Sequence, residues 1–258
     1  MAFNITSNGS NRNVVETLGS FNVIEYTKDP SVNACSALPE YFMSKMNVRR
    51  RQLLVEMDGQ NSVVTQTGAL QWSAGKIEAT TGLKGAGDLL KKVVRGSVTN
   101  ESAIKPEYKG VGTLVLEPSY KFIILQNVED WGAFGMSIED GMFLACEGSV
   151  AQKAVPRKSI SSFAMGNEGL FNLSLSGSGI VALESPVPAE ELIEITLNND
   201  TLKIDGNLAV CWSTSLDFTV ERSSKTLVGS SMNGEGLLNV YRGTGKVLLC
   251  PTATTNTP

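Results

Sequence analysis

The sequence predicts an all-β protein: a β-sandwich or barrel-like core of three tandem, pseudo-threefold repeats, with one short inserted helix. Three observations lead to this prediction, namely strand-like runs, turn residues between them, and glycine motifs that recur at a nearly constant spacing. In the runs, apolar and polar residues alternate, which places the apolar side chains on one face of a strand. Many short strands separated by regular turns are typical of sandwiches and barrels.

Strand signals extend over most of the chain after Arg49. Apolar and polar residues alternate most clearly in 171–176, 193–197 and 216–221. Asp-Gly and related pairs between such runs favour tight turns, because these residues tolerate positive φ. The turn signals are Asp140-Gly141, Gly177-Ser178-Gly179, Asn199-Asp200, Asp205-Gly206 and Gly243-Thr244-Gly245.

The repeats are predicted from two sets of glycines. In three Gly-x-Gly motifs the second glycines are 67 and 66 residues apart, and each motif is followed by a strand-like run. In the second set each glycine opens a strand, and the separations are 73 and 65 residues. We interpret all of these glycines as structural turn positions, since glycine adopts positive φ at little cost. They are Gly68, Gly110, Gly112, Gly141, Gly177, Gly179, Gly206, Gly243 and Gly245.

The repeats define the expected domain organisation. The first residues are rich in Asn and Ser, and the last ones in Thr, Asn and Pro, so both ends fall outside the repeated pattern. We expect a partly mobile N-terminal extension over 1–48, one β domain over 49–252 with modules at about 49–125, 126–190 and 191–252, and a tail over 253–258.

The first module is longer than the others, and the extra residues predict the inserted helix. Its apolar residues share one helical face, Asp88 can cap its N-terminus, and Gly96 can end it. We expect this helix to cover the end of the barrel; a partner or an anionic membrane surface is the alternative. The apolar residues of this candidate partner surface are Leu89, Leu90, Val93 and Val94.

Composition excludes several classes of chemistry. The 258 residues include no histidine, which rules out Ser-His-Asp and Cys-His couples and histidine zinc sites. A net charge of −4 argues against nucleic acid as a partner. The four cysteines form no CxxC pair, so we expect free thiols, with Cys146 and Cys211 buried. We find neither a signal peptide nor a long apolar segment, and expect a cytoplasmic protein.

No motif in the chain predicts a catalytic residue, a cofactor or a metal site. The pattern Gly177-x-Gly179-x-x-Ala182 fits a relaxed dinucleotide fingerprint, but a strand follows it where a helix is needed. Three glutamates, Glu101, Glu168 and Glu235, recur at equivalent places. They could bind a cation or lie at an interface, or simply be solvated at strand starts.

A compact positive run stands just before the apolar strand at 53–55. It consists of Arg49, Arg50 and Arg51. Tyrosine and phenylalanine do not cluster with Lys or Arg as a base-stacking surface needs. The run therefore does not predict an RNA-binding face.

The chain from about Arg49 to Thr252 resembles the altered inheritance of mitochondria protein twenty-four family, which has bacterial members. The resemblance is carried by Gly110–Pro118 (GVGTLVLEP), Asp205–Ala209 (DGNLA), Gly234–Leu238 (GEGLL), Gly243–Val247 (GTGKV) and the glycine-rich insert over 82–96. It implies a β-sandwich repeated three times, similar to the fold of the tryptophan RNA-binding attenuation protein. It also implies no catalytic residues, and fungal relatives are associated with the mitochondrial inner membrane.

We therefore expect a non-enzymatic scaffold or assembly protein that associates with itself or with another protein. The alternative is a module that binds a small ligand or RNA in grooves between the repeats. A hydrolase acting through carboxylates alone is the least favoured hypothesis.

Overall fold

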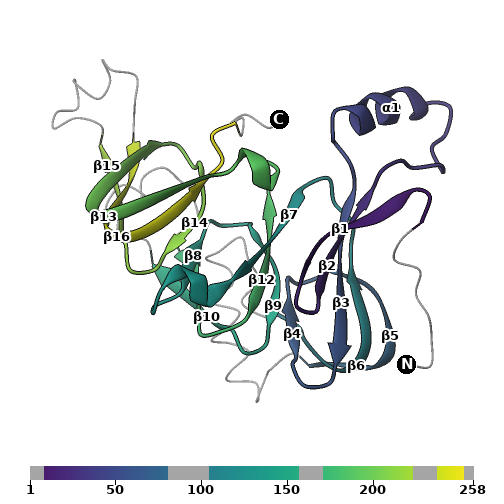
Figure 1. The fold of residues 1–258 in the computed structure, drawn as a ribbon, viewed down its shortest axis with the longest axis horizontal. Coiled ribbons are helices and arrows are strands. Elements are labelled where there is room, and N and C mark those ends of the chain that lie inside the picture. The colour runs from purple at the N-terminus through teal and green to yellow at the C-terminus, as the bar shows by residue number, and fades with distance from the viewer. Residues whose placement is uncertain (1–8, 81–104, 157–170, 223–236, 253–258) are drawn as a thin grey trace.

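The computed structural model describes residues 9–80, 105–156, 171–222 and 237–252. These residues form a mostly β protein: a near-closed barrel of eight strands, a curled half-barrel beside it, and one short α-helix (Figure 1). Every strand pairing within the described residues is antiparallel. The predicted β class is confirmed.

The barrel strands follow one another in space in an order that differs from their order in the chain. They are β1 (Arg12–Leu18), β2 (Phe21–Tyr26), β3 (Arg51–Asp58), β6 (Glu107–Leu116), β4 (Val63–Thr65), β9 (Phe143–Glu147), β12 (Ile180–Ser185) and β7 (Phe122–Asn127). A further strand, β5 (Leu70–Thr80), pairs with β6 alongside this path. The barrel nearly closes because β1 and β7, at the two ends of the order, contact each other.

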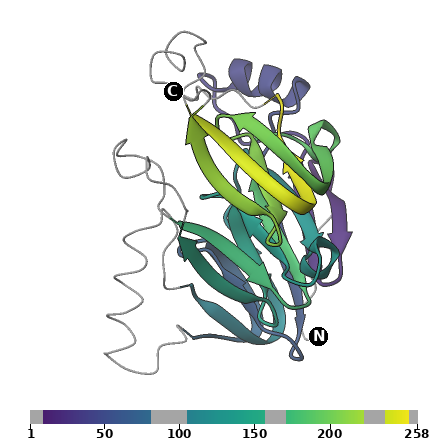
Figure 2. The same cartoon turned by 90° about the vertical axis from the view of Figure 1, so that its left-hand side faces the viewer.

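The half-barrel is built mainly from the C-terminal part of the chain, and Figure 2 shows the two curved sheets turned by 90°. Its strands are, in spatial order, β10 (Ala151–Pro156), β11 (Phe171–Ser176), β8 (Met136–Ile138), β14 (Ala209–Ser213), β16 (Leu237–Leu249) and β13 (Ile193–Asp205), with β15 (Asp217–Arg222) also paired to β16. Two short 3-10 helices, η1 (Val128–Trp131) and η2 (Ala189–Glu191), connect strands.

Apolar side chains fill the barrel, the half-barrel and the layer between them. Strand β12 connects two of these cores: Ile180 and Ala182 point into the barrel, whereas Val181 and Leu183 pack toward the half-barrel. Burial on both faces explains why residues 180–183 of this strand are all apolar. In the half-barrel the ring centroids of Trp212 and Tyr241 lie 5.2 Å apart. These packed cores hold the two sheets as one framework.

The three alternating runs are strands in the structure, as predicted, but two of the predicted turn signals lie inside strands. Strands β11 and β15 cover the predicted runs at 171–176 and 216–221 to within one residue, whereas β13 contains the run at 193–197 and continues to Asp205. The turn predicted at Asn199-Asp200 is wrong: it is a bulge inside β13, where Asn199 has a φ of 52°. The turn predicted at 243–245 is also wrong, because β16 continues through it and changes its neighbour from β15 to β14.

The described α-helix is not the predicted one. Helix α1 (Ala37–Lys45) lies at one end of the barrel, in the segment expected to be an extension (Figure 1). The same segment supplies β1 and β2, which the sequence did not lead us to expect. The predicted helix, with Leu89, Leu90, Val93 and Val94, lies outside the described residues.

Candidate functional site

Helix α1 exposes its apolar face to solvent, whereas an ordinary surface helix packs that face on the core. Its apolar residues follow the i, i+3, i+4 and i+8 spacing of one helical face, yet that face is open to solvent. The exposed fractions are 67% for Leu38, 56% for Tyr41, 57% for Phe42 and 76% for Met46. The opposite face, which is partly covered by the barrel, carries Glu40, Met43 and Ser44, and no residue of the helix is buried.

Local sequence explains where α1 begins and ends. Before the helix, the Asn33 side chain accepts hydrogen bonds from the backbone N–H groups of Cys35 and Ser36, a turn that asparagine commonly forms. After it, the Met46 N–H closes the last turn by donating to the Phe42 carbonyl, and Asn47 adopts a φ of 62°. Asparagine tolerates this left-handed conformation better than most residues, so the chain can leave the helix here.

Polar contacts hold α1 to the barrel. The Ser44 hydroxyl donates to the Thr27 carbonyl at 2.7 Å, and Arg49 Nε donates to the Ser44 carbonyl at 3.2 Å. The Arg49 guanidinium also pairs with Glu25 on β2 at 2.6 Å. These contacts use the polar face of the helix and leave its apolar face free for another surface.

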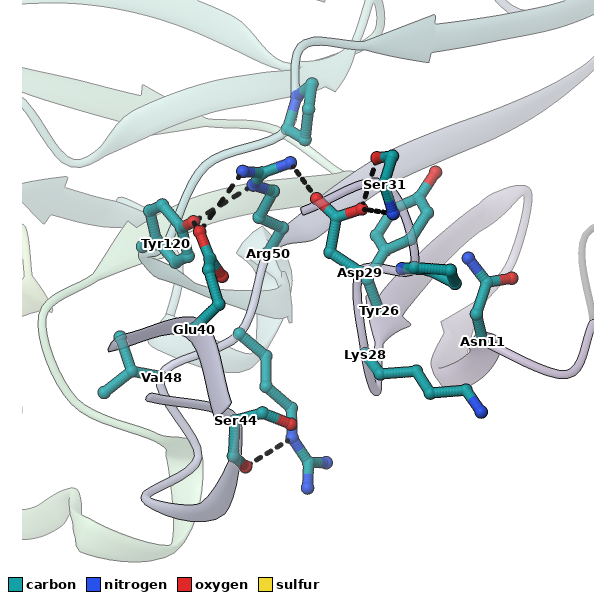
Figure 3. A pocket seen from close by; sticks show the side chains of 13 residues that line it. Asn11, Tyr26, Lys28, Asp29, Ser31, Glu40, Ser44, Val48, Arg50 and Tyr120 are labelled. Atoms are coloured by element: carbon teal, nitrogen blue, oxygen red, sulfur yellow. Dashed lines mark hydrogen bonds and ion pairs between the residues drawn. The ribbon is translucent and has the colours of Figure 1, made fainter. Parts of the chain in front are cut away.

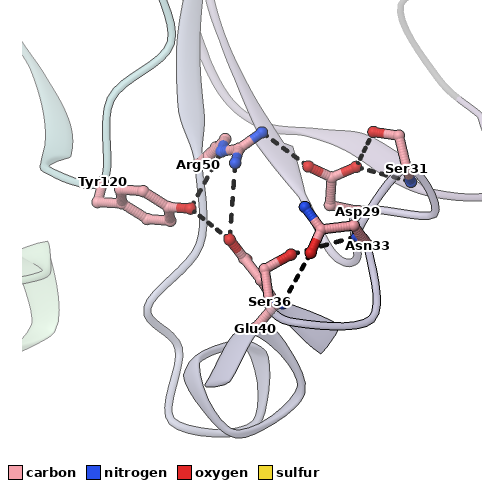
Figure 4. A network of polar contacts seen from close by, with 7 residues as sticks. All are labelled: Asp29, Ser31, Asn33, Ser36, Glu40, Arg50 and Tyr120. Carbon is pink, nitrogen blue, oxygen red and sulfur yellow. Dashed lines mark hydrogen bonds and ion pairs between the residues drawn. The ribbon is translucent and has the colours of Figure 1, made fainter. Parts of the chain in front are cut away.

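Arg50 lies at the centre of a second part of this anchor (Figure 4). Its guanidinium pairs with Asp29 at 2.7 Å and with Glu40 of α1 at 3.6 Å, and it donates to the Tyr120 hydroxyl at 3.1 Å. Tyr120 in turn donates to Glu40 at 3.0 Å, so the four side chains form a connected network. The contact with Tyr120, aided by the two carboxylates, raises the pKa of Arg50. Hydrogen bonds from Ser31, then the Arg50 charge, lower the pKa of Asp29.

Arg51 completes the anchor from inside the protein. It is 3% exposed, stacks over the Phe122 ring at 3.9 Å, and pairs with Glu25 at 2.7 Å. It also donates to the backbone and side-chain oxygens of Asn47, just after α1. Burial lowers the pKa of this guanidinium, and Glu25 opposes that change. The positive run at 49–51 is thus paired internally.

A cleft of about 540 Å³ lies between α1 and the barrel (Figure 3). Most of the residues that line it are polar or charged, among them Asn11, Lys28, Asp29, Glu40 and Arg50. Because Arg50 already holds two carboxylates and a hydroxyl, it has little capacity left for a ligand. Lys28 is exposed at the edge of the cleft and remains available.

The predicted turn glycines do not meet in one site. They are spread over both sheets, and all except Gly245 have positive φ. At Gly110 and Gly112, in the middle of β6, a Cβ atom would lie 1.9 Å from the Lys76 carbonyl oxygen and 2.1 Å from that of Ala74. The turn predicted at Gly110 and Gly112 is therefore wrong: β6 continues through both, and they let the backbones of β5 and β6 come close together.

The cysteine prediction is confirmed for all four thiols. They are free, Cys35 is exposed, and Cys146, Cys211 and Cys250 are buried. Burial raises the pKa of Cys146 to about 12 and that of Cys211 further, so neither is a nucleophile near neutral pH. The recurring glutamates Glu101, Glu168 and Glu235 lie outside the described residues.

The sequence analysis missed α1 and the acidic partners of its anchor. The spacing of Leu38, Tyr41, Phe42 and Met46 was the available signal for the helix. No comparable signal pointed to Glu25 or Asp29, because ion pairs between distant positions follow from the fold. No helix in the described ranges is both long and apolar enough to cross a membrane.

Comparisons with known proteins find one family model and similar streptococcal proteins. The model of the family described as mitochondrial biogenesis AIM24 matches residues 45–252. An uncharacterized protein of Streptococcus pyogenes serotype M6 is 31% identical over 205 residues, covering 76% of this chain and 80% of the relative. A crystal structure of a Streptococcus pyogenes protein has a TM-score of 0.57 and 28% identity, covering 79% of this chain and 88% of the other.

Proposed function

We propose that this chain, which belongs to the mitochondrial biogenesis AIM24 family, is a non-enzymatic assembly protein that binds a protein partner through the outer face of α1. The observation that carries the proposal is the orientation of the helix. Four large apolar side chains face solvent while the side with Glu40, Met43 and Ser44 faces its own barrel. Contiguous exposed apolar surface of this kind marks interaction sites.

Energetics support binding as the role of this face. Burying an apolar side chain of this size is worth roughly 1.5–3 kcal/mol. In a monomer, turning α1 over would gain part of that energy, but the anchor of Glu40, Ser44 and Arg50 holds it outward. A face kept exposed by dedicated contacts is well suited to docking.

The repeated architecture is part of the same proposal. In β6 the neighbour changes from β4 to β3 around Gly110-x-Gly112, and in β16 it changes from β15 to β14 around Gly243-x-Gly245. The motif at 177–179 separates β11, in the half-barrel, from β12, in the barrel. The change of neighbour within β6 and β16, and the change of sheet at 177–179, support three related modules, for which we propose a fold like that of the tryptophan RNA-binding attenuation protein. Free thiols support a cytoplasmic location.

Photo-crosslinking tests the proposed function directly. A photoreactive amino acid at Phe42 should form a covalent adduct with protein in cells, and the adduct should disappear when Leu38→Asp is added. A probe at Ile193, which is 49% exposed on β13, is the matched control and should form none. Absence of a protein adduct at Phe42, or an equal one at Ile193, would contradict the proposal.

Binding of a small ligand in the cleft behind α1 is the second candidate. The observation in its favour is a volume of about 540 Å³ with Lys28 and Asn11 on its lining, a size typical of ligand pockets. RNA is not proposed, because the three arginines of the 49–51 run are each paired with carboxylates.

A further inference from the structure

A second cavity opens at the end of the barrel opposite α1. Its volume is about 570 Å³. Strand β3 connects the two ends, since it starts at Arg51 in the α1 anchor and finishes at Asp58 beside this cavity (Figure 1). A strand of this length spans roughly 25 Å. The residues that line the cavity, named here the acidic groove, are Gly19, Ser20, Glu56, Met57, Asp58, Asn61, Val63, Val111 and Glu147.

The acidic groove combines apolar surface with negative charge. Val111 is 49% exposed and provides an apolar wall, while Glu56, Asp58 and Glu147 provide three carboxylates. The described residues that line it include no lysine or arginine. Asp58 accepts a hydrogen bond from the backbone N–H of Gln60, which orients its carboxylate. No group of side chains in the described ranges could hold a metal ion here.

The outer face of α1 has the complementary character. Lys45 lies on this face, 5.4 Å from the centre of the Tyr41 ring. The carboxylates nearest the helix point inward, since Glu40 and Asp29 bind Arg50, and Glu25 binds Arg49 and Arg51. The face is therefore apolar with a positive charge, and the acidic groove is negatively charged with Val111 as its exposed apolar side chain.

We propose that the outer face of α1 docks into the acidic groove of a second copy of this chain, so that copies join head to tail. This inference rests on the proposed function and names its partner. Pairing of two α1 helices would instead bring both Lys45 side chains into one interface without a carboxylate to offset them. Because the two surfaces lie at opposite ends of one barrel, each copy can bind one neighbour at each end. Complementary charge selects this pairing.

Mixing two defective variants tests the head-to-tail contact. The first, Leu38→Asp with Phe42→Asp, loses the α1 face, and the second, Glu56→Lys with Asp58→Lys, loses the acidic groove. All four side chains are exposed, so both variants should stay folded, although the second also loses the Asp58–Gln60 hydrogen bond and should unfold slightly below the wild-type temperature. In sedimentation velocity the wild-type protein should form species larger than a dimer as its concentration rises.

Each variant alone should be monomeric, and an equimolar mixture should form a heterodimer and nothing larger. Lys45→Glu should weaken association at least tenfold, and combining Lys45→Glu with Glu56→Lys in one chain should restore it. Raising the salt concentration from 0.05 M to 0.5 M should also weaken the wild-type association at least tenfold, since exposed charges are screened.

A mixture that stays monomeric would overturn the inference, as would a groove variant that still dimerises by itself. The result separates the two proposals. If the mixture is monomeric but Phe42 still crosslinks to a different protein, only the head-to-tail contact is wrong. If Phe42 forms no protein adduct either, the proposed function fails as well.

Discussion

Gly110 shows how a single missing side chain allows two strands to pack. Its φ is +132°, and a Cβ atom would lie 1.9 Å from the Lys76 carbonyl oxygen. Gly110→Ala should therefore lower the free energy of unfolding by about 1–2 kcal/mol for the backbone conformation and by about 1–3 kcal/mol more for the overpacking. Urea denaturation measures the change.

Gly68 is the matched control for this prediction. It also has a positive φ, +77°, but nothing lies within 4 Å of its Cβ position. Gly68→Ala should lower the free energy of unfolding only by the contribution of the backbone conformation, about 1–2 kcal/mol. If both substitutions lowered stability equally, close backbone contact at Gly110 would not be the reason for its glycine.

The arginine run shows where residue-level prediction reaches its limit. A positive patch is what Arg49, Arg50 and Arg51 indicate when only their neighbours in the chain are considered. The structure pairs them with Glu25 and Asp29, more than 20 positions earlier. Charge clusters can be found in a sequence, but whether they are neutralised depends on strand pairing.

At the scale of single elements, α1 depends on its anchor more than on its own packing. A helix of nine residues is marginal in isolation, and none of its side chains is buried. Arg50→Met should remove the links to Asp29, Glu40 and Tyr120 together. We expect amide exchange in α1 to accelerate at least tenfold, while global stability falls by about 1 kcal/mol or less.

Arg242→Met provides the control for the anchor. Arg242 forms an exposed ion pair with Glu221 at 2.6 Å, between β16 and β15, far in the chain from α1. This variant should leave α1 exchange unchanged. If the amide exchange rates in α1 were the same in wild-type protein and in Arg50→Met, the Arg50 network would not be what holds the helix.

Elements were predictable where periodicity was strong and local. The runs at 171–176 and 216–221 became strands because alternation alone places their apolar face on a core. The hairpin of β1 and β2 was missed, although Gly19-Ser20 between two alternating runs is a recognised hairpin signal. Polar residues at the start of the chain obscured it. Helix α1 was missed although its apolar residues have helical spacing, because the segment was interpreted as an extension outside the repeats.

At the scale of the whole molecule, barrel closure brings together the first and last strands of the spatial order. Strands β1 and β7 contact each other without forming a paired ladder in the described structure. Glu16 on β1 bridges them by accepting a hydrogen bond from the Leu125 backbone N–H. Closure of a barrel depends on the summed twist and tilt of all its strands. The sequence therefore predicted a barrel-like core but not the contact between β1 and β7, which we name the seam.

The seam should make stability depend on pH through Glu16. Partial burial raises the pKa of this carboxyl above its ordinary value of 4.5, and the Leu125 bond offsets the shift only in part. The folded state therefore holds this proton more tightly than the unfolded state, and the resulting stabilisation is lost as pH rises through the folded-state pKa.

Glu16→Gln stays neutral and keeps an oxygen that can accept the Leu125 bond. It should be more stable than wild type at pH 7, by about 1 kcal/mol or less, and equally stable below pH 4.5. Urea unfolding at both pH values measures this, with Glu16→Ala, which lacks the acceptor, expected to be less stable than Glu16→Gln at both. If the difference in free energy of unfolding between Glu16→Gln and wild type were the same at pH 7 and at low pH, the Glu16 charge would not destabilise the seam.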